Sequence, residues 1–302
     1  MFRASLFGGA LAFGGYSWFS ATAYTANPKS FNHQALAKDI ASLIDDDISI
    51  APTLIRLSWH NSGVYSARSG DASGCPNSAA MRFEPEASHG ANAGLANARA
   101  KLAAVQAKHA GASHADVWTL AGTVAIAAMD GPVAKWRWGR TDAKSGKEGN
   151  QDPNRLPDAA QGAAHIRDVF GRMGFTDREA VALIGAHAVG ECHANASGFV
   201  GPWTFSKYTF SNEYFVALLK EKWIEDKTGR TKKFQYTDAA TKSLMMLPAD
   251  LAVIQDPAFK KVATEYANDN DLFRKDFAAA WTKLCELGYK AGQLQDCDAI
   301  AL

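Results

Sequence analysis

Arg56, Trp59 and His60 form the first group of residues whose types and spacing suit chemistry. They lie in the segment APTLIRLSWH, where Pro52 suits the first turn of a helix. Residues three or four positions apart share one face of a helix, so these side chains would be grouped. A neutral imidazole can move a proton between the two oxygens of a peroxide, and a guanidinium can stabilise charge on the leaving oxygen. Ordinary amphipathic helices carry the same trio, so the spacing alone leaves both interpretations open.

His187, Trp203 and Asp250 form a second group, although no spacing rule joins them. His187 lies near the end of the apolar segment AVALIGAHAVG, whose small residues would let a bulky group approach. It is either a core residue or a ligand of haem iron, and a ligand needs an acceptor for its second ring nitrogen. Asp250 is an acid in an apolar run, which is costly to bury unpaired, but it also suits a helix start near Pro248. Trp203, after a Gly-Pro pair, is by itself typical of a packing residue.

Helical patterns dominate the segments that must position these groups. Apolar residues recur at helical spacing from Leu36 to Ile44, and capping boxes are expected at 113–116 and 176–179. The pair Asp256-Pro257 suits another helix start, and DLFRKDFAAAWTKLCEL predicts a long closing helix. We expect at most a short hairpin, within residues 228–236. The sequence predicts a mainly α fold of about ten helices.

Composition excludes several classes of protein. The chain has 302 residues with a formal net charge of +1, which gives no support to nucleic-acid binding. Its four cysteines form no CxxC pair, so we expect free thiols rather than a zinc site or a disulfide framework. No glycine-rich nucleotide motif stands at a junction of a strand and a helix.

The N-terminal segment differs from the rest of the chain. Residues 6–24 are 19 consecutive residues without a charge, preceded by Arg3. We therefore expect residues 1–30 to be a hydrophobic anchor or targeting segment, with membrane association through residues 6–24.

Several segments together resemble the class I haem peroxidases. This family includes the cytochrome c peroxidases, the ascorbate peroxidases and the catalase-peroxidases. LIRLSWHNSG resembles the distal helix of that family, SHGANAGL its asparagine loop, and LIGAHAVGECH its proximal helix. SGFVGPW and MLPADLAVIQDPAF resemble the segments that carry the proximal tryptophan and carboxylate. The similarity runs in order from about Phe31 to Leu287. It implies a two-lobed helical fold, residues 31–302, with one haem b between a distal lobe (about 31–157) and a proximal lobe (about 158–302).

The resemblance also implies roles on the distal side. His60 would be the acid-base residue that cleaves hydrogen peroxide, and Arg56 would stabilise the developing charge. Trp59 would lie above the haem. Asn92 would accept a hydrogen bond from His60 and raise its basicity.

On the proximal side, the resemblance makes His187 the ligand of the haem iron, with Asp250 holding its imidazole. Trp203 would stack on His187 and donate its indole N–H to the same carboxylate. It would then store one oxidising equivalent as a cation radical while ferryl iron stores the other. His193 matches a position near a haem propionate.

The electron donor is the point on which the groups of the family differ. Ascorbate peroxidases carry an arginine nine residues after the proximal histidine, where this chain has Ala196. The acidic run Asp45-Asp46-Asp47 resembles the place where cytochrome-binding peroxidases carry acids, although a solvated helix end is the simpler interpretation. We therefore expect ferrocytochrome c as the donor, with ascorbate or a phenol at the haem edge as the alternative. A haem sensor or carrier without catalysis is a further alternative, which the pairing of Arg56 with His60 disfavours.

Other features bear on ions and location. Thr204 and Ser206 could serve a proximal cation site, but Ala188 and Ser211 depart from that pattern, so a bound cation stays open. Cys192 is expected near Trp203, either as an electron source or as a packing residue.

The mixture of motifs resembles the hybrid peroxidases of trypanosomatids. That resemblance implies a mitochondrial protein at the inner membrane, facing the intermembrane space.

Overall fold

The computed structural model describes residues 31–68, 71, 74–231 and 233–297. Within these residues it contains ten α-helices, as expected of a mainly α fold. They are α1 (His33–Asp46), α2 (Ala51–Ser62), α3 (Ala96–Gln106), α4 (His114–Ala128), α5 (Ala163–Arg172), α6 (Asp177–Ile184), α7 (Glu213–Lys220), α8 (Pro248–Gln255), α9 (Pro257–Asn268) and α10 (Asn270–Glu286).

Short strands and 3-10 turns complete the fold. The strands are β1 (Arg137–Trp138), β2 (Glu191–Cys192), β3 (Gly201–Pro202), β4 (Trp223–Glu225), β5 (Tyr236–Asp238), β6 (Met245–Met246) and β7 (Gln295–Asp296). The 3-10 turns are η1 (Ile48–Ile50), η2 (Ala80–Arg82), η3 (Glu86–Ser88), η4 (Gly90–Asn92), η5 (Gly146–Glu148) and η6 (Gly185–Ala188).

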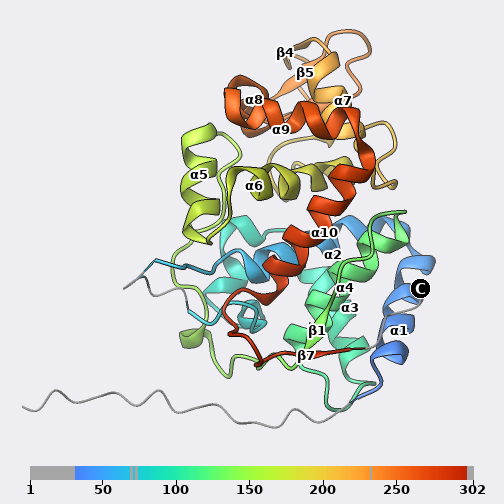
Figure 1. Cartoon of the computed structure of the whole chain (residues 1–302), viewed down its shortest axis with the longest axis vertical. Helices are drawn as coiled ribbons and strands as arrows, with labels where there is room; N and C mark the ends of the chain where they lie inside the picture. Colours follow the sequence, from blue (N-terminus) through green and yellow to red (C-terminus); the bar gives the residue numbers. More distant parts are fainter. Residues whose placement is uncertain (1–30, 69–70, 72–73, 232, 298–302) are drawn as a thin grey trace, which may run out of the picture.

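Helices α1 to α4 pack together in the lower half of Figure 1. The closest crossing is between α2 and α4, and Gly122 makes it close: a Cβ atom there would lie 2.6 Å from the Cβ of Ser58. Around this crossing, Leu54, Leu57 and Trp118 are almost completely buried. The helix that carries Arg56 and His60 is therefore fixed against a rigid neighbour.

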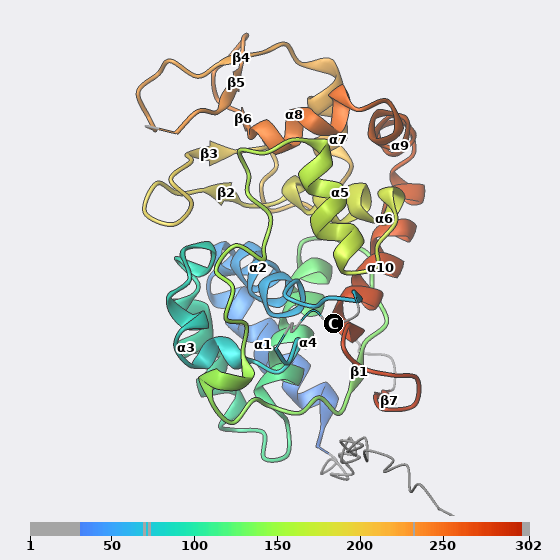
Figure 2. The same ribbon diagram turned by 90° about the vertical axis from the view of Figure 1, so that its left-hand side faces the viewer.

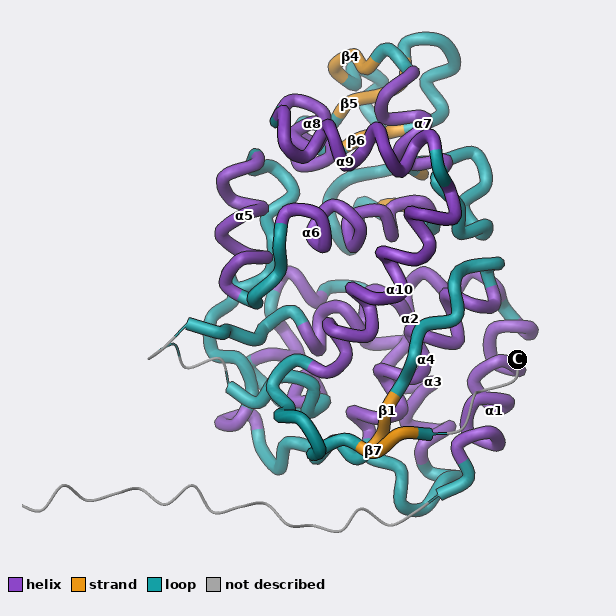
Figure 3. The backbone as a smooth tube through the Cα atoms, in the orientation of Figure 1, coloured by secondary structure: helices purple, strands orange, loops and turns teal. Residues whose placement is uncertain are grey.

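Helices α5 to α9 and the strands β2 to β6 occupy the upper half, as Figures 2 and 3 show. The strands β4, β5 and β6 form one antiparallel sheet, and β2 pairs with β3. Helix α6 begins with the expected capping box, in which Thr176 and Glu179 satisfy each other's backbone N–H groups. It ends at Ile184, and the chain continues as η6 before it turns at Gly190.

The C-terminal part connects the two halves. Helix α10 contacts α6 and α9 in the upper half and α2 in the lower half. Beyond it, β7 pairs with β1, so that Gln295 lies opposite Trp138. The last described residues of the chain therefore pack on the half that the first residues build.

Two local predictions were wrong in part. Ser113 accepts a hydrogen bond from the Asp116 N–H, but the Asp116 carboxylate does not return to the helix start. It binds the buried guanidinium of Arg140 and the N–H of Gly139, because a buried cation holds it more strongly than a backbone amide. The hairpin exists, but β4 ends before residue 228 and β5 begins only at Tyr236, so most of the predicted range is the connecting loop.

The segment expected to meet a membrane lies outside the described part of the chain. None of the helices in the described part of the chain has the length and hydropathy needed to cross a bilayer. Residues 6–24, on which the anchor prediction rests, lie outside the described residues.

Candidate functional site

His60 and Asn92 form the centre of the distal side. Nδ1 of His60 lies 2.8 Å from Oδ1 of Asn92, and Nδ2 of Asn92 donates to the carbonyl oxygen of Glu86 at 2.8 Å. The second bond fixes the orientation of the amide, so Oδ1 faces the imidazole and accepts its Nδ1–H. Nε2 of His60 is then the basic nitrogen.

Burial keeps His60 neutral. The side chain is buried, and desolvation together with the charge of Arg56 lowers its pKa from 6.5 to about 3, although the bond to Asn92 acts in the opposite direction. A neutral imidazole can accept a proton at physiological pH, which is what a general base requires.

Arg56 lies one turn before His60 on α2 and is half-buried. Its guanidinium donates to the carbonyl oxygens of Ala91 at 2.6 Å and Ala93 at 2.9 Å. These carbonyls flank Asn92, so Arg56 also holds the loop that orients His60. Trp59, on the same helix, stacks on Phe170 of α5 with ring centroids 5.3 Å apart.

His187, Trp203 and Asp250 meet on the proximal side, although they come from three separate segments. His187 lies in η6, and its Nδ1 is 2.8 Å from Oδ1 of Asp250. The indole N–H of Trp203 donates to Oδ2 at 2.8 Å. The rings of His187 and Trp203 stack with centroids 4.2 Å apart and an interplanar angle of 13°.

Asp250 is completely buried and accepts four hydrogen bonds. Besides His187 and Trp203, its donors are the Tyr214 hydroxyl at 2.8 Å, on Oδ1, and the Leu247 N–H at 2.8 Å, on Oδ2. Burial by itself raises the pKa of this carboxyl, but the electrostatic interaction with His187 and the hydrogen bonds outweigh it and lower the pKa. The bond to Leu247 N also means that Asp250 does serve the start of α8, so both interpretations of this residue hold.

Tyr214 is the member of this group that sequence reasoning missed. It comes from α7 and lies 36 positions from Asp250, so no local spacing indicated the contact. The available signal was its polar hydroxyl in an otherwise apolar segment, which must find a partner if it is buried.

Cys192 lies close to the segment that carries Trp203. Its strand β2 pairs with β3, so Cys192 lies opposite Gly201, two residues before Trp203. The thiol is buried, which raises its pKa to about 11, and the charges of both Asp250 and Arg56 also act on it. The two sides also meet directly, because a Cβ atom on Gly94 would lie 3.0 Å from the Cβ of Ala196 and 3.7 Å from the Arg56 guanidinium.

The remaining predicted residues lie outside this centre. His193 is exposed and contributes only its backbone carbonyl to a turn. The end of α1 exposes three acids, Asp45, Asp46 and Asp47. The Asp47 carboxylate accepts hydrogen bonds from the hydroxyl and the N–H of Ser49, which lower the pKa of Asp47.

The Thr204 hydroxyl donates to the Ala188 carbonyl at 2.7 Å. Ala196 packs against Gly94 and offers no polar group.

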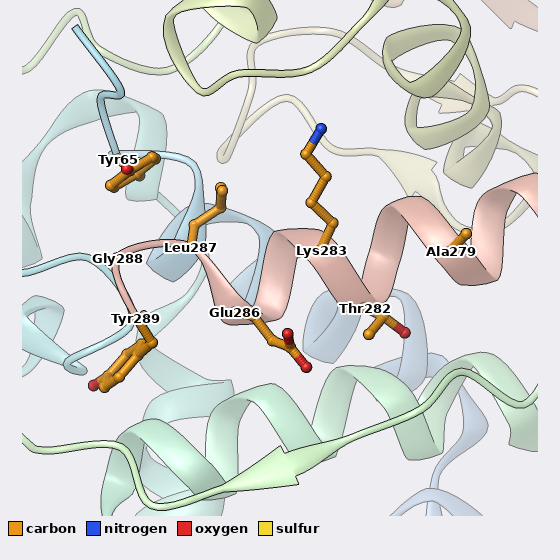
Figure 4. A pocket seen from close by; sticks show the side chains of 8 residues that line it. All are labelled: Tyr65, Ala279, Thr282, Lys283, Glu286, Leu287, Gly288 and Tyr289. Atoms are coloured by element: carbon orange, nitrogen blue, oxygen red, sulfur yellow. The ribbon is translucent and has the colours of Figure 1, made fainter. Parts of the chain in front are cut away.

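The described residues contain no competing metal cluster, and their main pocket lies elsewhere. In the described residues, no three His, Cys, Asp or Glu side chains gather as they would around a metal ion. The pocket in Figure 4 lies along the C-terminal end of α10 and contains none of the residues discussed above. Cys75, Cys192, Cys285 and Cys297 all lie in described segments, and no disulfide joins any two of them.

Comparison with known proteins identifies the family. The profile of the family described as Peroxidase matches residues 36–269. The chain belongs to the peroxidase family. This peroxidase is 48% identical to the mitochondrial cytochrome c peroxidase of Pyricularia oryzae, over 92% of this chain and 78% of the relative. It is also 48% identical to the protein of that name from Neurospora crassa (93% and 79%) and 49% identical to a putative heme-binding peroxidase of Pyricularia oryzae (87% and 89%).

Haem is the cofactor that this membership implies, and the donor set of this peroxidase fits it. Asp250 takes Nδ1 of His187 and leaves Nε2 for an iron ion, while 33% of the imidazole side chain stays exposed. A neutral imidazole whose other nitrogen is bound to a carboxylate is the usual histidine ligand of a metal. On the other side, His60 offers a neutral, basic imidazole.

Proposed function

We propose that this peroxidase reduces hydrogen peroxide to water with electrons from ferrocytochrome c, and that these electrons enter through Trp203. The observation that carries the proposal is the shared carboxylate of Asp250, which joins the imidazole of His187 to the indole of Trp203. Bound haem would supply the redox-active iron at which the peroxide bond breaks. The chain itself supplies the proton transfer, the charge stabilisation and the electron path.

On the distal side, His60 acts as the acid-base residue. Its Nε2 takes a proton from the nearer peroxide oxygen and returns it to the departing one, while Asn92 holds the Nδ1–H. Arg56, held beside His60 by the Ala91 and Ala93 carbonyls, would stabilise the negative charge on the departing oxygen. Trp59 excludes water above the haem.

On the proximal side, the Trp203 indole loses one electron and holds the resulting cation radical. Its ring lies parallel to His187, and the negative charge of Asp250 stabilises a cation on the indole. A tryptophan to which a carboxylate is bound therefore loses an electron more readily than one bound to a neutral acceptor.

The acidic end of α1 is the proposed docking site for cytochrome c. Asp45 and Asp46 are exposed there, and a basic partner would be steered towards them. The next segment connects this end to the Trp203 region: Pro52 contacts Gly190, whose N–H donates to the Lys207 carbonyl at 2.7 Å. Between Trp203 and Lys207, Phe205 is 64% exposed and offers an apolar contact near the electron path.

The double variant Asp45→Lys/Asp46→Lys tests the donor. We expect kcat/KM for ferrocytochrome c to fall about tenfold at low ionic strength, and the loss to shrink as salt screens the charges. The control Glu221→Lys reverses an exposed acid at the end of another helix, α7, and should change little. Equal losses in both variants, or faster turnover with ascorbate than with cytochrome c in the unmodified protein, would contradict the proposal.

Trp203→Phe tests the electron path. Cytochrome c oxidation should be abolished, while the rate of peroxide cleavage in stopped-flow spectra stays largely intact. Trp223→Phe is the matched control, because its indole N–H donates to a backbone carbonyl, that of Leu218, instead of a carboxylate. Normal cytochrome turnover in Trp203→Phe would remove this residue from the path.

The same proposal covers organisation and location. Haem would lie between a distal lobe of about residues 31–157 and a proximal lobe of about 158–302, with α10 and β7 returning to the distal side.

A mitochondrial location agrees with the names of the relatives. We place the protein at the inner membrane, facing the intermembrane space, on the basis of the uncharged residues 6–24. His193 is proposed near a haem propionate, and ascorbate stays the alternative donor.

A further inference from the structure

The hydroxyl of Tyr214 shares an acceptor with the proposed iron ligand. It donates to Oδ1 of Asp250 at 2.8 Å, and the same oxygen lies 2.8 Å from Nδ1 of His187. The Tyr214 ring stands almost perpendicular to the His187 imidazole, with centroids 5.8 Å apart. Two donors from two different elements, α7 and η6, therefore compete for one carboxylate oxygen.

Ring packing alone does not require this hydroxyl. The Tyr214 ring contacts Phe215 edge to face, and a phenylalanine would keep that contact. The side chain is 0% exposed, so its hydroxyl has no contact with water. The hydrogen bond to Asp250 offsets the free-energy cost of burying this polar group. Burial, together with the charge of Asp250, raises the pKa of Tyr214 well above its usual value, so the hydroxyl stays protonated and acts as a donor.

A second hydrogen-bond donor on Oδ1 changes how strongly the Asp250 carboxylate acts on the His187 imidazole. A carboxylate that binds an imidazole N–H draws the proton towards itself and makes the ring more anionic, which stabilises oxidised iron. A second donor on the same oxygen takes part of that negative charge. The hydroxyl therefore opposes the effect of Asp250 on the imidazole.

We propose that Tyr214 is a positioning residue that limits the charge Asp250 delivers to His187 and so raises the reduction potential of the haem iron. The inference rests on ligation of haem by His187, as in the proposed function, but not on the identity of the electron donor. Tyr214 acts only through Asp250 and touches neither peroxide nor cytochrome c.

Tyr214→Phe tests this inference, with Tyr266→Phe as the matched control. Tyr266 is equally buried, and its hydroxyl also donates to a carboxylate, Oδ2 of Asp276 at 2.9 Å, but that carboxylate does not bind His187. Both variants remove one buried hydroxyl and keep the ring. Unfolding of each haem-loaded protein in urea shows whether their folding is comparable.

The readouts are the Fe(III)/Fe(II) midpoint potential by spectroelectrochemistry and the iron–histidine stretching frequency by resonance Raman. In Tyr214→Phe the potential should fall by an amount equal to about a tenfold shift in the equilibrium, which is about 59 mV for one electron. The stretching frequency should rise, because a more anionic imidazole binds iron more strongly. Tyr266→Phe should change neither.

An unchanged or higher potential in Tyr214→Phe, or equal shifts in both variants, would overturn the inference. Failure of the proposed function gives a different result. If the unmodified protein does not oxidise ferrocytochrome c, the donor is wrong, yet the potential of Tyr214→Phe still falls. If the iron–histidine band is absent altogether, ligation by His187 is wrong, and this inference is overturned with it.

Discussion

Asp250→Asn replaces a buried carboxylate with an amide of the same shape. Each carboxylate oxygen serves two donors: Oδ1 accepts from His187 and Tyr214, and Oδ2 accepts from Trp203 and Leu247. An amide has one oxygen and one NH₂ group. Whichever way it is turned, its NH₂ group faces two donors that have lost their acceptor.

The expected cost follows from this count. A buried donor without a partner costs about 1–3 kcal/mol, so two such donors lower the free energy of unfolding by about 2–6 kcal/mol. Total stabilities of folded proteins are about 5–15 kcal/mol, so the variant loses a large share of its stability. Urea unfolding of the haem-loaded protein, followed by circular dichroism, measures the loss.

Asp276→Asn is the control. Asp276 accepts from Arg178 and Tyr266 on the same oxygen, Oδ2, and its side chain is 23% exposed. An amide can turn its oxygen to both donors, so the cost is that of a partly exposed ion pair, at most about 1 kcal/mol. A loss of less than about 0.5 kcal/mol in Asp250→Asn, the range of ordinary surface substitutions, would refute the reasoning.

Three further predictions concern the distal side and the core. Asn92→Ala should slow the reaction with peroxide about 100-fold in stopped-flow absorbance, because His60 loses its acceptor; an unchanged rate would contradict this role. The pKa of His60 is lowered from 6.5 to about 3, so protonation favours the unfolded chain. The stability from this group is present above pH 6.5 and is lost below it, by up to about 1.4 kcal/mol per pH unit; urea unfolding from pH 7 to 4 should show a flatter profile in His60→Gln, and identical profiles would count against it. Asp116→Ala leaves the buried Arg140 unpaired and should cost about 3–5 kcal/mol, whereas Asp168→Ala, at an exposed pair with Arg68, should cost at most about 1 kcal/mol by thermal unfolding.

Local signals predicted the helix ends well. Pro52 in the first turn of α2, the Thr176–Glu179 capping box and the Asp256-Pro257 start all depend on neighbours within four residues. Prediction failed where a distant partner competed. The Asp116 carboxylate binds Arg140, 24 positions away, instead of the N–H group at the helix start. Nothing in the local pattern indicates that contact.

The site shows the same division. The distal spacing of Arg56 and His60 follows from one helix, so the sequence alone groups them. The proximal group needs η6, the turn that follows β3 and the start of α8 to converge. No local pattern indicates this convergence, and only the family resemblance predicts that Trp203 and Asp250 meet His187. Tyr214 had neither spacing nor resemblance to indicate it, because its role depends on where its hydroxyl lies in three dimensions.

The pairing of β7 with β1 has a consequence for biosynthesis. Phe31 packs edge to face on Trp138 with ring centroids 5.6 Å apart, and Gln295 lies opposite the same Trp138. The two ends of the described chain thus converge on one residue of the lower half. The lower half therefore completes this contact only after residues 295–296 have been synthesised, although Phe31 and Trp138 are available much earlier.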